Sequence, residues 1–432
     1  MHLAANARSS TKAARCASRR ATRARRIAAG WIVAVTKGPG VGGRVDDADA
    51  LRACRVHPGG MHDGTNQRSI VLSMTGRSGR RAAYLVGALA ALLMSTFAAT
   101  AHAAPSVRVE TVCFTVNNTG DPLPTVLFGK RFTTGRPTGA TPAIVLVHGV
   151  ASSADNWDFT PGYSVARELA RRGFVAIAYD RLGFARSRYD RPKGGHLATT
   201  PNQRDILHQV VGQVKSGGYD TAAGGSCSAP RTRSVLANPT VVIAGHSAGG
   251  AIAQGYPGKF HDVAAMVQGS YSNRGSGPVV TKQLTEVVAP SLARGDDYVP
   301  FFRNRAECEA FNIHPPGAVP SVVRVACDPS RFVLTPAGEW TGILALQQEN
   351  DQFVKATGSI PVLLTYGDHD AAFPPSTADA DEAYWRANCA CDVTRYDEPA
   401  TGHLFMAHRS MTAWVEEVTR WLASRGIAPP AV

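Results

Sequence analysis

The sequence predicts an α/β fold in which a mostly parallel β-sheet carries helices on both faces. Several runs have the length of a strand and are apolar at every position, such as residues 143–147 (AIVLV) and 175–179 (VAIAY). Continuous apolarity indicates strands buried on both faces, as in parallel sheets covered by helices. These runs alternate with stretches of helical spacing, which is the pattern of βαβ units. In addition, a Gly-x-Ser-x-Gly sequence directly follows one of the runs.

The apolar runs define the expected strands. In chain order they span residues 107–116, 125–132, 143–147, 175–179, 240–244, 263–267, 362–364 and, more weakly, 391–396. Turn-forming residues 117–122 (NNTGDP) separate the first two runs, so we expect these two to form an antiparallel pair.

Helical patterns lie between and after these strands. One covers residues 163–172, and another opens at Thr200 with a capping box that ends at Gln203. The last helix is amphipathic, with apolar residues from Met411 to Leu422 at helical spacing. Residues 272–349 show no clear strand and are rich in Pro, Gly and Arg. An insertion of that size predicts a cap over the edge of the sheet.

Composition excludes several classes of protein. The 432 residues are 44% apolar and 7% aromatic, which argues against disorder throughout, collagen and a multi-span membrane protein. The net charge of +13 suggests a nucleic-acid partner, but residues 1–81 hold 16 Lys and Arg against 4 Asp and Glu, which leaves 30 against 29 elsewhere. Because a nucleic-acid footprint must lie on the folded domain, we expect no nucleic-acid partner.

The N-terminal region contains a predicted export signal. Residues 82–101 are uncharged and mostly apolar and follow Arg80 and Arg81. The sequence Ala101-His102-Ala103 at the end of this stretch is typical of signal-peptidase sites. We therefore interpret residues 74–103 as a signal peptide and expect a secreted or periplasmic protein without stable membrane insertion. A retained membrane anchor is the alternative. Residues 1–73 are interpreted as an extension from a start codon assigned too far upstream, with a basic regulatory tail as the alternative.

The mature chain then divides into a first core segment (104–271), the cap (272–349) and a second core segment (350–432). It retains six cysteines, an even number that suggests disulfides in an exported protein. Cys308 and Cys327 are the favoured pair because they bracket a Pro-rich loop, whose closure would stabilise the fold by about 3 kcal/mol. No C-x-x-C or H-x-x-x-H pair is present after residue 103, so we expect no metal site.

The strongest chemical motif is Gly245-His246-Ser247-Ala248-Gly249, directly after the strand at 240–244. A strand, a sharp turn and a helix in this order raise a serine hydroxyl above a sheet, and the turn needs small flanking residues. The backbone N–H of Ala248 would then lie at a helix N-terminus, where it can donate to an oxyanion. The alternative is a Gly-rich helix start used for packing or for phosphate binding.

A serine nucleophile requires a base and an orienting carboxylate. His403 lies between the last strand and the last helix, where the base is expected, and its rival His408 falls inside that helix, where a histidine is usually solvated. Asp370 follows the strand at 362–364 and is favoured as the carboxylate. Asp368 is its rival, but we expect it to cap the loop.

The loop after residues 143–147 supplies a second oxyanion donor. Gly149 permits close approach of the backbone, and the N–H of Val150 is the expected donor, with His148 holding the loop in place. Candidates for the pocket wall are aromatic residues near these loops, and the alternative for each is ordinary packing. They are Trp157, Phe184, Tyr271, Phe301, Phe302 and Phe373.

Taken in order, the motifs His148-Gly149, 179–187 (YDRLGFARS), Gly245 to Gly250, 367–370 (GDHD) and Gly402-His403 resemble the α/β-hydrolase superfamily, in its esterase and lipase branch. The resemblance implies an eight-stranded sheet, a cap after the sixth strand, and a triad of Ser247, Asp370 and His403. One departure is Ala185, where relatives often have glycine, and we expect only a local change there.

The expected function is therefore hydrolysis of small-molecule or lipid-like carboxylic esters, without a metal or an organic cofactor. Alternatives that share the triad are an amidase, a lactonase and a cofactor-free perhydrolase. A non-catalytic binding protein on the same fold is a further alternative. The oligomeric state is left open.

Overall fold

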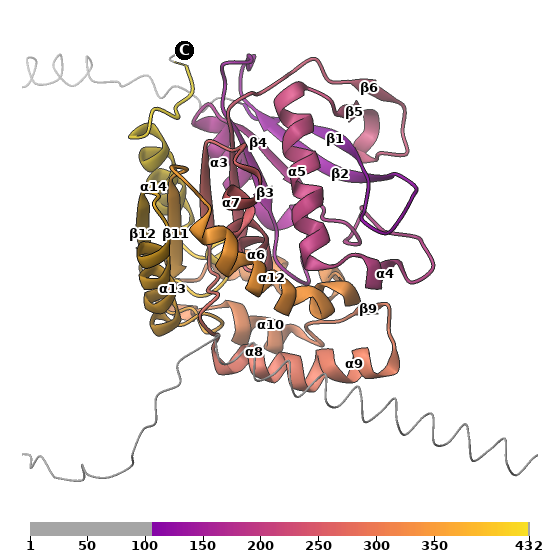
Figure 1. Ribbon diagram of the computed structural model, residues 1–432, viewed down its shortest axis with the longest axis vertical. Coiled ribbons are helices and arrows are strands. Elements are labelled where there is room, and N and C mark those ends of the chain that lie inside the picture. Colours follow the sequence, from indigo (N-terminus) through magenta and orange to yellow (C-terminus); the bar gives the residue numbers. More distant parts are fainter. Residues whose placement is uncertain (1–105, 431–432) are drawn as a thin grey trace, which may run out of the picture. The chain divides into compact units, whose positions relative to one another are not determined.

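The computed structural model describes residues 106–430 of the chain (Figure 1). The predicted extension at 1–73 and the predicted signal peptide at 74–103 lie outside the described residues. Within the described range, no helix is both long enough and apolar enough to span a bilayer.

The main sheet has ten strands within the described residues, in the order β12-β11-β8-β7-β3-β4-β2-β1-β5-β6. Their bounds are β1 (Arg108–Val116), β2 (Thr125–Thr133), β3 (Ala143–Val147), β4 (Val175–Tyr179), β5 (Asp220–Ala222), β6 (Arg231–Arg233), β7 (Val241–His246), β8 (Ala265–Gly269), β11 (Val362–Gly367) and β12 (Val393–Glu398). The expected count of eight is wrong. The additional strands β5 and β6 have three residues each and no apolar run, so hydrophobic patterning cannot detect them.

The sheet is mostly parallel, as predicted. Strands β12, β11, β8, β7, β3 and β4 are consecutive in the sheet and parallel to one another. Strands β1 and β2 form the predicted antiparallel pair, and β2 is also antiparallel to β4. The six parallel strands therefore end at the same edge of the sheet, where the loops that follow them meet.

The helices are α3 (Val165–Arg171), α4 (Gly194–Leu197), α5 (Thr200–Ser216), α6 (Ala248–Gln254), α7 (Tyr256–Phe260), α8 (Pro278–Gln283), α9 (Ala289–Arg294), α10 (Arg305–Asn312), α11 (Pro320–Ala326), α12 (Ala337–Lys355), α13 (Pro375–Asn388) and α14 (Met411–Ala423). They cover both faces of the sheet. On β3, for example, Val145 belongs to the core shared with α5, α6, α12 and α13, whereas Ile144 belongs to the core shared with α3 and α14.

Helix α5 begins one residue away from the predicted cap. Its N-cap is Thr199, whose Oγ1 accepts a hydrogen bond from the N–H of Asn202 at 3.3 Å. Thr200 is already the first helical residue, and the Gln203 side chain bonds to the backbone of Leu182 instead of the helix start. The predicted capping box is therefore wrong, because a tertiary contact takes the glutamine.

The segment between β8 and β11 contains helices α8 to α12 and a short ribbon of β9 (Tyr298–Val299) and β10 (Thr335–Pro336). Figure 1 shows α8, α9 and α10 grouped beyond one end of the sheet. Helix α12 leaves this group and packs against α5, α6 and α7. The segment between β8 and β11 therefore contains a separate group of short helices and, in α12, one helix of the layer that covers one face of the sheet.

The described residues contain three disulfides. Cys308 and Cys327 form the predicted pair and join α10 to the residue after α11. Cys113 on β1 pairs with Cys227, and Cys389 pairs with Cys391. The Cys308–Cys327 disulfide therefore links α10 to the end of α11 within the β8–β11 segment.

Candidate active site

Ser247 occupies the turn between β7 and α6, and its backbone is strained. Its φ and ψ are 55° and −123°, outside the regions that non-glycine residues prefer. Such a conformation costs on the order of 1–3 kcal/mol and persists only where its surroundings enforce it. Here the N–H of Ser247 donates to the carbonyl of Gly269 at 2.9 Å, and its own carbonyl accepts from the N–H of Ala251 at 3.0 Å.

The glycines around Ser247 are required by close backbone approach. A Cβ added to Gly245 would lie 2.2 Å from the carbonyl oxygen of Gly249, and one added to Gly249 would lie 2.1 Å from that of Val147. Backbone atoms at these distances cannot yield to a side chain. Gly149 also lies against the serine, since its added Cβ would be 3.0 Å from Ser247 Cβ.

His403 and Asp370 are joined by a buried hydrogen bond. Nδ1 of His403 lies 2.9 Å from Oδ2 and 3.1 Å from Oδ1 of Asp370. The carboxylate also accepts the N–H groups of Ala372 and Phe373 at 2.8 and 2.9 Å. Because a carboxylate only accepts hydrogen bonds, Nδ1 carries the ring proton, which leaves Nε2 as the nitrogen that can take another.

The two rival residues support the histidine loop instead. Asp368 accepts the N–H groups of Ala400 and Thr401 at 3.0 Å each. Burial opposes ionisation of Asp368, but the hydrogen bond with His369 and these two backbone bonds lower its pKa. His408 is fully buried and precedes α14, so its predicted place inside that helix is wrong. Its Nε2 accepts the N–H of Gly402 at 3.1 Å.

The loop after β3 is held by a buried histidine and a buried arginine. The N–H of Arg181 donates to Nε2 of His148 at 3.0 Å, and Nδ1 of His148 donates to the carbonyl of Gly149 at 2.8 Å. Burial lowers the pKa of His148 well below its ordinary value, so the ring is neutral. The Arg181 side chain donates to the carbonyls of His148 and Gly149 at 3.0 Å each, which restrains the loop that carries Val150.

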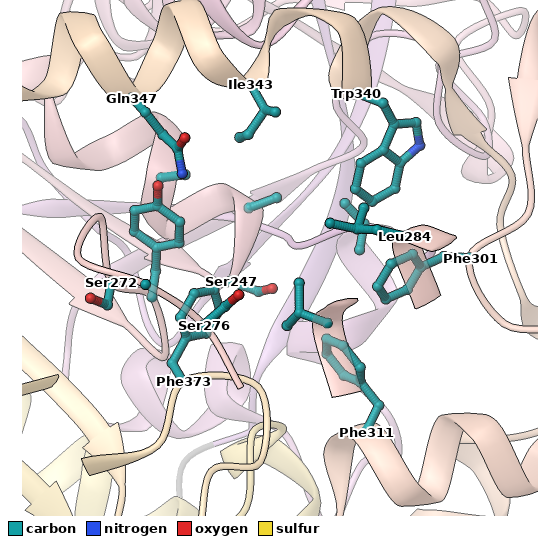
Figure 2. A pocket seen from close by; sticks show the side chains of 16 residues that line it. Ser247, Ser272, Ser276, Leu284, Phe301, Phe311, Trp340, Ile343, Gln347 and Phe373 are labelled. Carbon is teal, nitrogen blue, oxygen red and sulfur yellow. The ribbon is translucent and has the colours of Figure 1, made fainter. Parts of the chain in front are cut away.

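An apolar cavity opens beside Ser247 and encloses about 650 Å³ of empty space, including its mouth. We call it the apolar cavity. Val150 and Ala248, the predicted oxyanion donors, both line it. Figure 2 shows Ser247 near its centre, between Phe373 on one side and Phe301 and Phe311 on the other. As the first residue of α6, Ala248 has an N–H without a partner four residues earlier in its helix.

A second cavity, the polar cavity, adjoins Ser247 from another side. Its lining includes His403, His246, Ser152, Asn156 and Asn312. Ser247 and His403 therefore face one common space, although 155 residues separate them in the chain.

The predicted wall residues divide into two groups. Tyr271, Phe301 and Phe373 line the apolar cavity, and Phe302 lines the polar cavity. Trp157 and Phe184 line neither cavity, and their predicted role is wrong. Trp157 is buried in the core among Phe405 and Trp414, and Phe184 packs against His148 beneath the Arg181 guanidinium.

Sequence reasoning missed several residues of the apolar cavity. Val280, Leu284 and Phe311 come from the segment without clear periodicity, so no pattern indicates their position. Trp340, Ile343 and Gln347 lie on one face of α12 at spacings of three and four. That spacing is a helical signal that could have revealed the wall.

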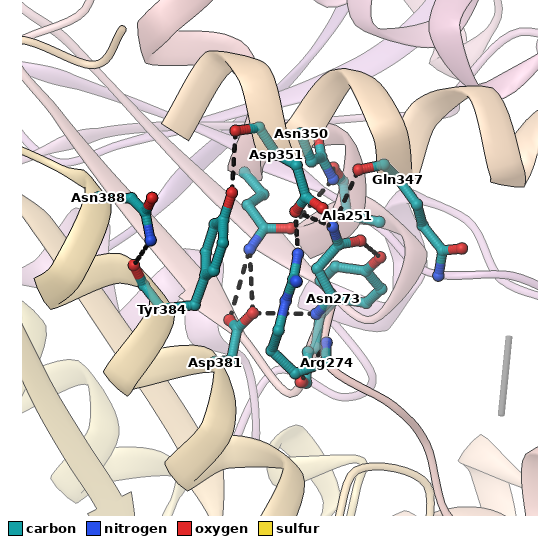
Figure 3. Close-up of polar contacts among 12 residues, drawn as sticks. Ala251, Asn273, Arg274, Gln347, Asn350, Asp351, Asp381, Tyr384 and Asn388 are labelled. Atoms are coloured by element: carbon teal, nitrogen blue, oxygen red, sulfur yellow. Dashed lines mark hydrogen bonds and ion pairs between the residues drawn. The ribbon is translucent and has the colours of Figure 1, made fainter. Parts of the chain in front are cut away.

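A polar network lies behind the apolar cavity and fixes its rear wall. Figure 3 shows Asn273 between Asp381 and Asp351: its N–H donates to Asp381 at 3.0 Å and its amide to Asp351 at 2.9 Å. The Tyr271 hydroxyl donates to Asn273 Oδ1 at 2.8 Å, and the Asn273 amide also donates to the carbonyl of Gln347 at 3.0 Å. Two wall residues are thus tied to each other through one asparagine.

The part of the chain that the structure describes contains no group of three or more His, Cys, Asp and Glu side chains arranged to hold a metal ion. In structural terms, the site consists of a strained serine, a histidine paired with an aspartate, and two cavities of different polarity that meet at the serine.

Comparisons with known proteins identify a family. The family model described as Alpha/beta hydrolase family matches residues 144–418, well over half of the chain. A search of curated proteins finds no match. Among solved structures, a monoacylglycerol lipase from Paleococcus ferrophilus is 17% identical, with a TM-score of 0.49 over 69% of this chain and 99% of that chain. An esterase from Thermogutta terrifontis is 18% identical, with a TM-score of 0.49 over 72% and 98%.

Proposed function

The chain belongs to the alpha/beta hydrolase family, and we propose that it is a secreted serine hydrolase that cleaves carboxylic esters by acyl transfer. The observation that carries the proposal is the buried Asp370–His403 hydrogen bond beside the cavity into which Ser247 also faces. A nucleophile, a base and an orienting carboxylate are the minimum set for this reaction.

In the proposed mechanism, Ser247 Oγ attacks the ester carbonyl while its proton passes to Nε2 of His403. The negative charge that develops on the carbonyl oxygen is stabilised by the N–H groups of Val150 and Ala248. The bond to the alcohol then breaks, and His403 returns the proton to the departing alcohol oxygen. Water, deprotonated by the same histidine, attacks the acyl-enzyme and releases the acid and the free serine.

Asp370 keeps the proton of His403 on Nδ1 and stabilises the imidazolium that forms during both steps. The N–H groups of Ala372 and Phe373 hold the Asp370 carboxylate in place. The mechanism uses no metal and no organic cofactor.

The proposal is tested by Ser247→Ala. This substitution is expected to lower kcat for p-nitrophenyl butyrate by roughly 10⁴- to 10⁶-fold and to abolish labelling by a fluorophosphonate probe. Ser216→Ala, at the exposed end of α5, is the matched control and is expected to retain full activity. Turnover of wild-type magnitude by Ser247→Ala would rule out the proposed nucleophile.

Two alternatives are separated by substrates and by labelling. An amidase, a lactonase or a perhydrolase would use the same triad, so a panel of amides, lactones and esters with acyl chains of about two to sixteen carbons distinguishes them. A non-catalytic binding protein on this fold would fail to react with the fluorophosphonate probe.

Export is part of the proposal and is supported by the disulfides among the described residues, which are typical of oxidising compartments. The mature protein is expected to begin after Ala103. N-terminal sequencing of protein recovered outside the cytoplasm tests this expectation, and an intact segment before Ala103 would contradict it.

A further inference from the structure

The two cavities beside Ser247 differ in chemistry. The apolar cavity is lined mainly by aliphatic and aromatic side chains, none of its lining residues is charged, and three serines and Gln347 are its main polar residues. The polar cavity is lined by two histidines, two asparagines and two serines together with apolar residues. Each cavity therefore suits a different part of one substrate.

Ser247 and Val150 line both cavities, and so do two phenylalanines, Phe301 and Phe311. Phe311 also contacts the His403 ring edge-on, with ring centres 5.1 Å apart. The two phenylalanine rings are 5.1 Å apart and nearly perpendicular. The two rings therefore separate the cavities. An ester bound at Ser247 places its acyl part on one side of the rings and its alcohol part on the other, and we call these parts the two arms of the substrate.

The position of His403 decides which arm is which. It lines the polar cavity and is absent from the lining of the apolar one. In ester cleavage the imidazole returns its proton to the alcohol oxygen as the C–O bond breaks, so this oxygen must lie within hydrogen-bond reach of the ring. The alcohol arm therefore occupies the polar cavity, and the acyl arm occupies the apolar cavity.

The polar cavity also leads outward. Four residues, Ala151, Ser152, Asn156 and Ala326, line both it and a third cavity that includes Arg186 and the exposed Arg331. A polar alcohol released beside His403 can leave along this route past the side chains of Ser152 and Asn156, which can form hydrogen bonds with it. An apolar alcohol would lie against hydrogen-bonding side chains, which costs free energy when those groups lose water.

We infer that the substrates are esters of an apolar acid with a small polar alcohol, a conclusion that rests on the proposed serine-hydrolase function. In the reaction, Ser247 Oγ forms a bond to the acyl carbon in the apolar cavity and the bond from that carbon to the alcohol oxygen breaks. The serine proton goes to the alcohol oxygen through His403, and water later replaces the serine.

Two isomeric esters test the orientation with the full protein. 2-Hydroxyethyl hexanoate has an apolar acid and a polar alcohol, whereas hexyl glycolate has the reverse arrangement. The kcat/KM of each ester is divided by the rate constant of the same ester for alkaline hydrolysis, which corrects for its intrinsic reactivity. The corrected value is expected to be at least about tenfold higher for the hexanoate. An equal or higher value for hexyl glycolate overturns the inference.

Failure of the inference and failure of the proposed function give different results. A protein that hydrolyses p-nitrophenyl butyrate but prefers the glycolate, or cleaves neither isomer, refutes the orientation and leaves the serine mechanism standing. A protein that hydrolyses no ester and does not react with the fluorophosphonate refutes both.

A matched pair of variants assigns each cavity to its arm. Ile343→Phe fills the apolar cavity and is expected to lower the preference for 2-hydroxyethyl hexanoate over 2-hydroxyethyl acetate by about tenfold or more. Asn156→Leu changes only the polar and third cavities and is expected to shift preference from 2-hydroxyethyl acetate toward hexyl acetate. The inference is contradicted if Ile343→Phe changes the preference for the alcohol and Asn156→Leu changes the preference for the acyl chain. Unchanged thermal midpoints confirm that both variants are folded.

Discussion

Arg181 and Glu339 form an ion pair that is almost completely withdrawn from water. Nη1 of Arg181 lies 2.6 Å from Oε1 of Glu339, and the two side chains are 0% and 1% exposed. Burial raises the pKa of Glu339, and the adjacent guanidinium opposes that rise. The remaining nitrogens of Arg181 donate to the carbonyls of His148 and Gly149. One side chain therefore links helix α12, which contributes Trp340 to the cavity wall, to the loop that carries Val150.

Replacement of Arg181 separates the two roles of this pair. Arg181→Met leaves Glu339 buried without a counter-charge, which is expected to destabilise the protein by about 3–5 kcal/mol. It also frees the Val150 loop, and a displacement of about 1 Å at a reacting centre can lower kcat by roughly 100-fold.

The double variant Arg181→Met/Glu339→Leu removes both charges and is expected to recover most of the lost stability but not the lost kcat. Thermal unfolding and steady-state kinetics on the same samples measure the two effects. Full recovery of kcat in the double variant would show that Arg181 contributes only to stability.

The two aspartates after β11 make a matched pair for the orienting role. Asp370→Asn replaces the acceptor of the His403 Nδ1 proton with a neutral amide and is expected to lower kcat by about 10³- to 10⁴-fold with a small change in KM. Asp368→Asn keeps one acceptor for the backbone of the histidine loop, and we expect less than a tenfold fall in kcat. The reverse ranking in steady-state kinetics would assign the carboxylate to Asp368.

Removal of each long-range disulfide is expected to have a different consequence. The chain-entropy model gives about 3 kcal/mol for loops of the length closed by Cys308–Cys327 and somewhat more for Cys113–Cys227. Helix α10 also holds the site, because its Asn312 carbonyl accepts the N–H of Leu404 at 3.0 Å. Cys308→Ser/Cys327→Ser is therefore expected to lower both stability and kcat.

The control for this prediction is Cys113→Ser/Cys227→Ser. Cys113 lies on β1, which three strands separate from β7 in the sheet, so we expect lower stability with unchanged kcat. Denaturant unfolding and kinetics below the unfolding temperature measure both properties. A similar loss of kcat in the two double variants would refute a specific role for α10.

The sheet and the sharp turn at Ser247 were predictable because their physical requirements are local. Runs such as Ile144 to Val147 are buried on both faces, and the close backbone approach at Gly245 and Gly249 requires glycine. The short strands β5 and β6 were not predictable, since their pairing depends on the neighbouring edge rather than on apolar residues of their own.

The cavity walls show where sequence patterning fails. Trp157 and Phe184 lie near the expected loops in the chain, but both side chains are buried in the core. Phe311, by contrast, lines the apolar cavity although it comes from a distant segment of irregular pattern. His408 was expected in water and is instead a buried acceptor for the histidine loop. Such assignments depend on tertiary packing, which short-range periodicity does not report.

His246, the residue before Ser247, is expected to make the stability of the fold sensitive to acid. Burial, followed in size by the nearby His403, lowers the pKa of His246 to about 3, and Nε2 donates to the carbonyl of His403 at 2.9 Å. In the unfolded chain a histidine has a pKa of about 6.5, so between roughly pH 3 and 6.5 the unfolded state binds the additional proton. Stability from this group is present above pH 6.5 and is lost as the pH falls, by about 2 kcal/mol between pH 7 and 5.

His246→Gln retains a donor near His403 but removes the titrating ring. We expect the free energy of unfolding of the variant to fall by about 2 kcal/mol less than that of the wild type between pH 7 and 5. Between pH 7 and 8, where histidines in the unfolded chain are mostly neutral, the two proteins should show nearly parallel values. Urea unfolding at these three pH values measures the difference. Identical acid dependence of the two proteins would contradict a lowered pKa of His246 in the folded protein.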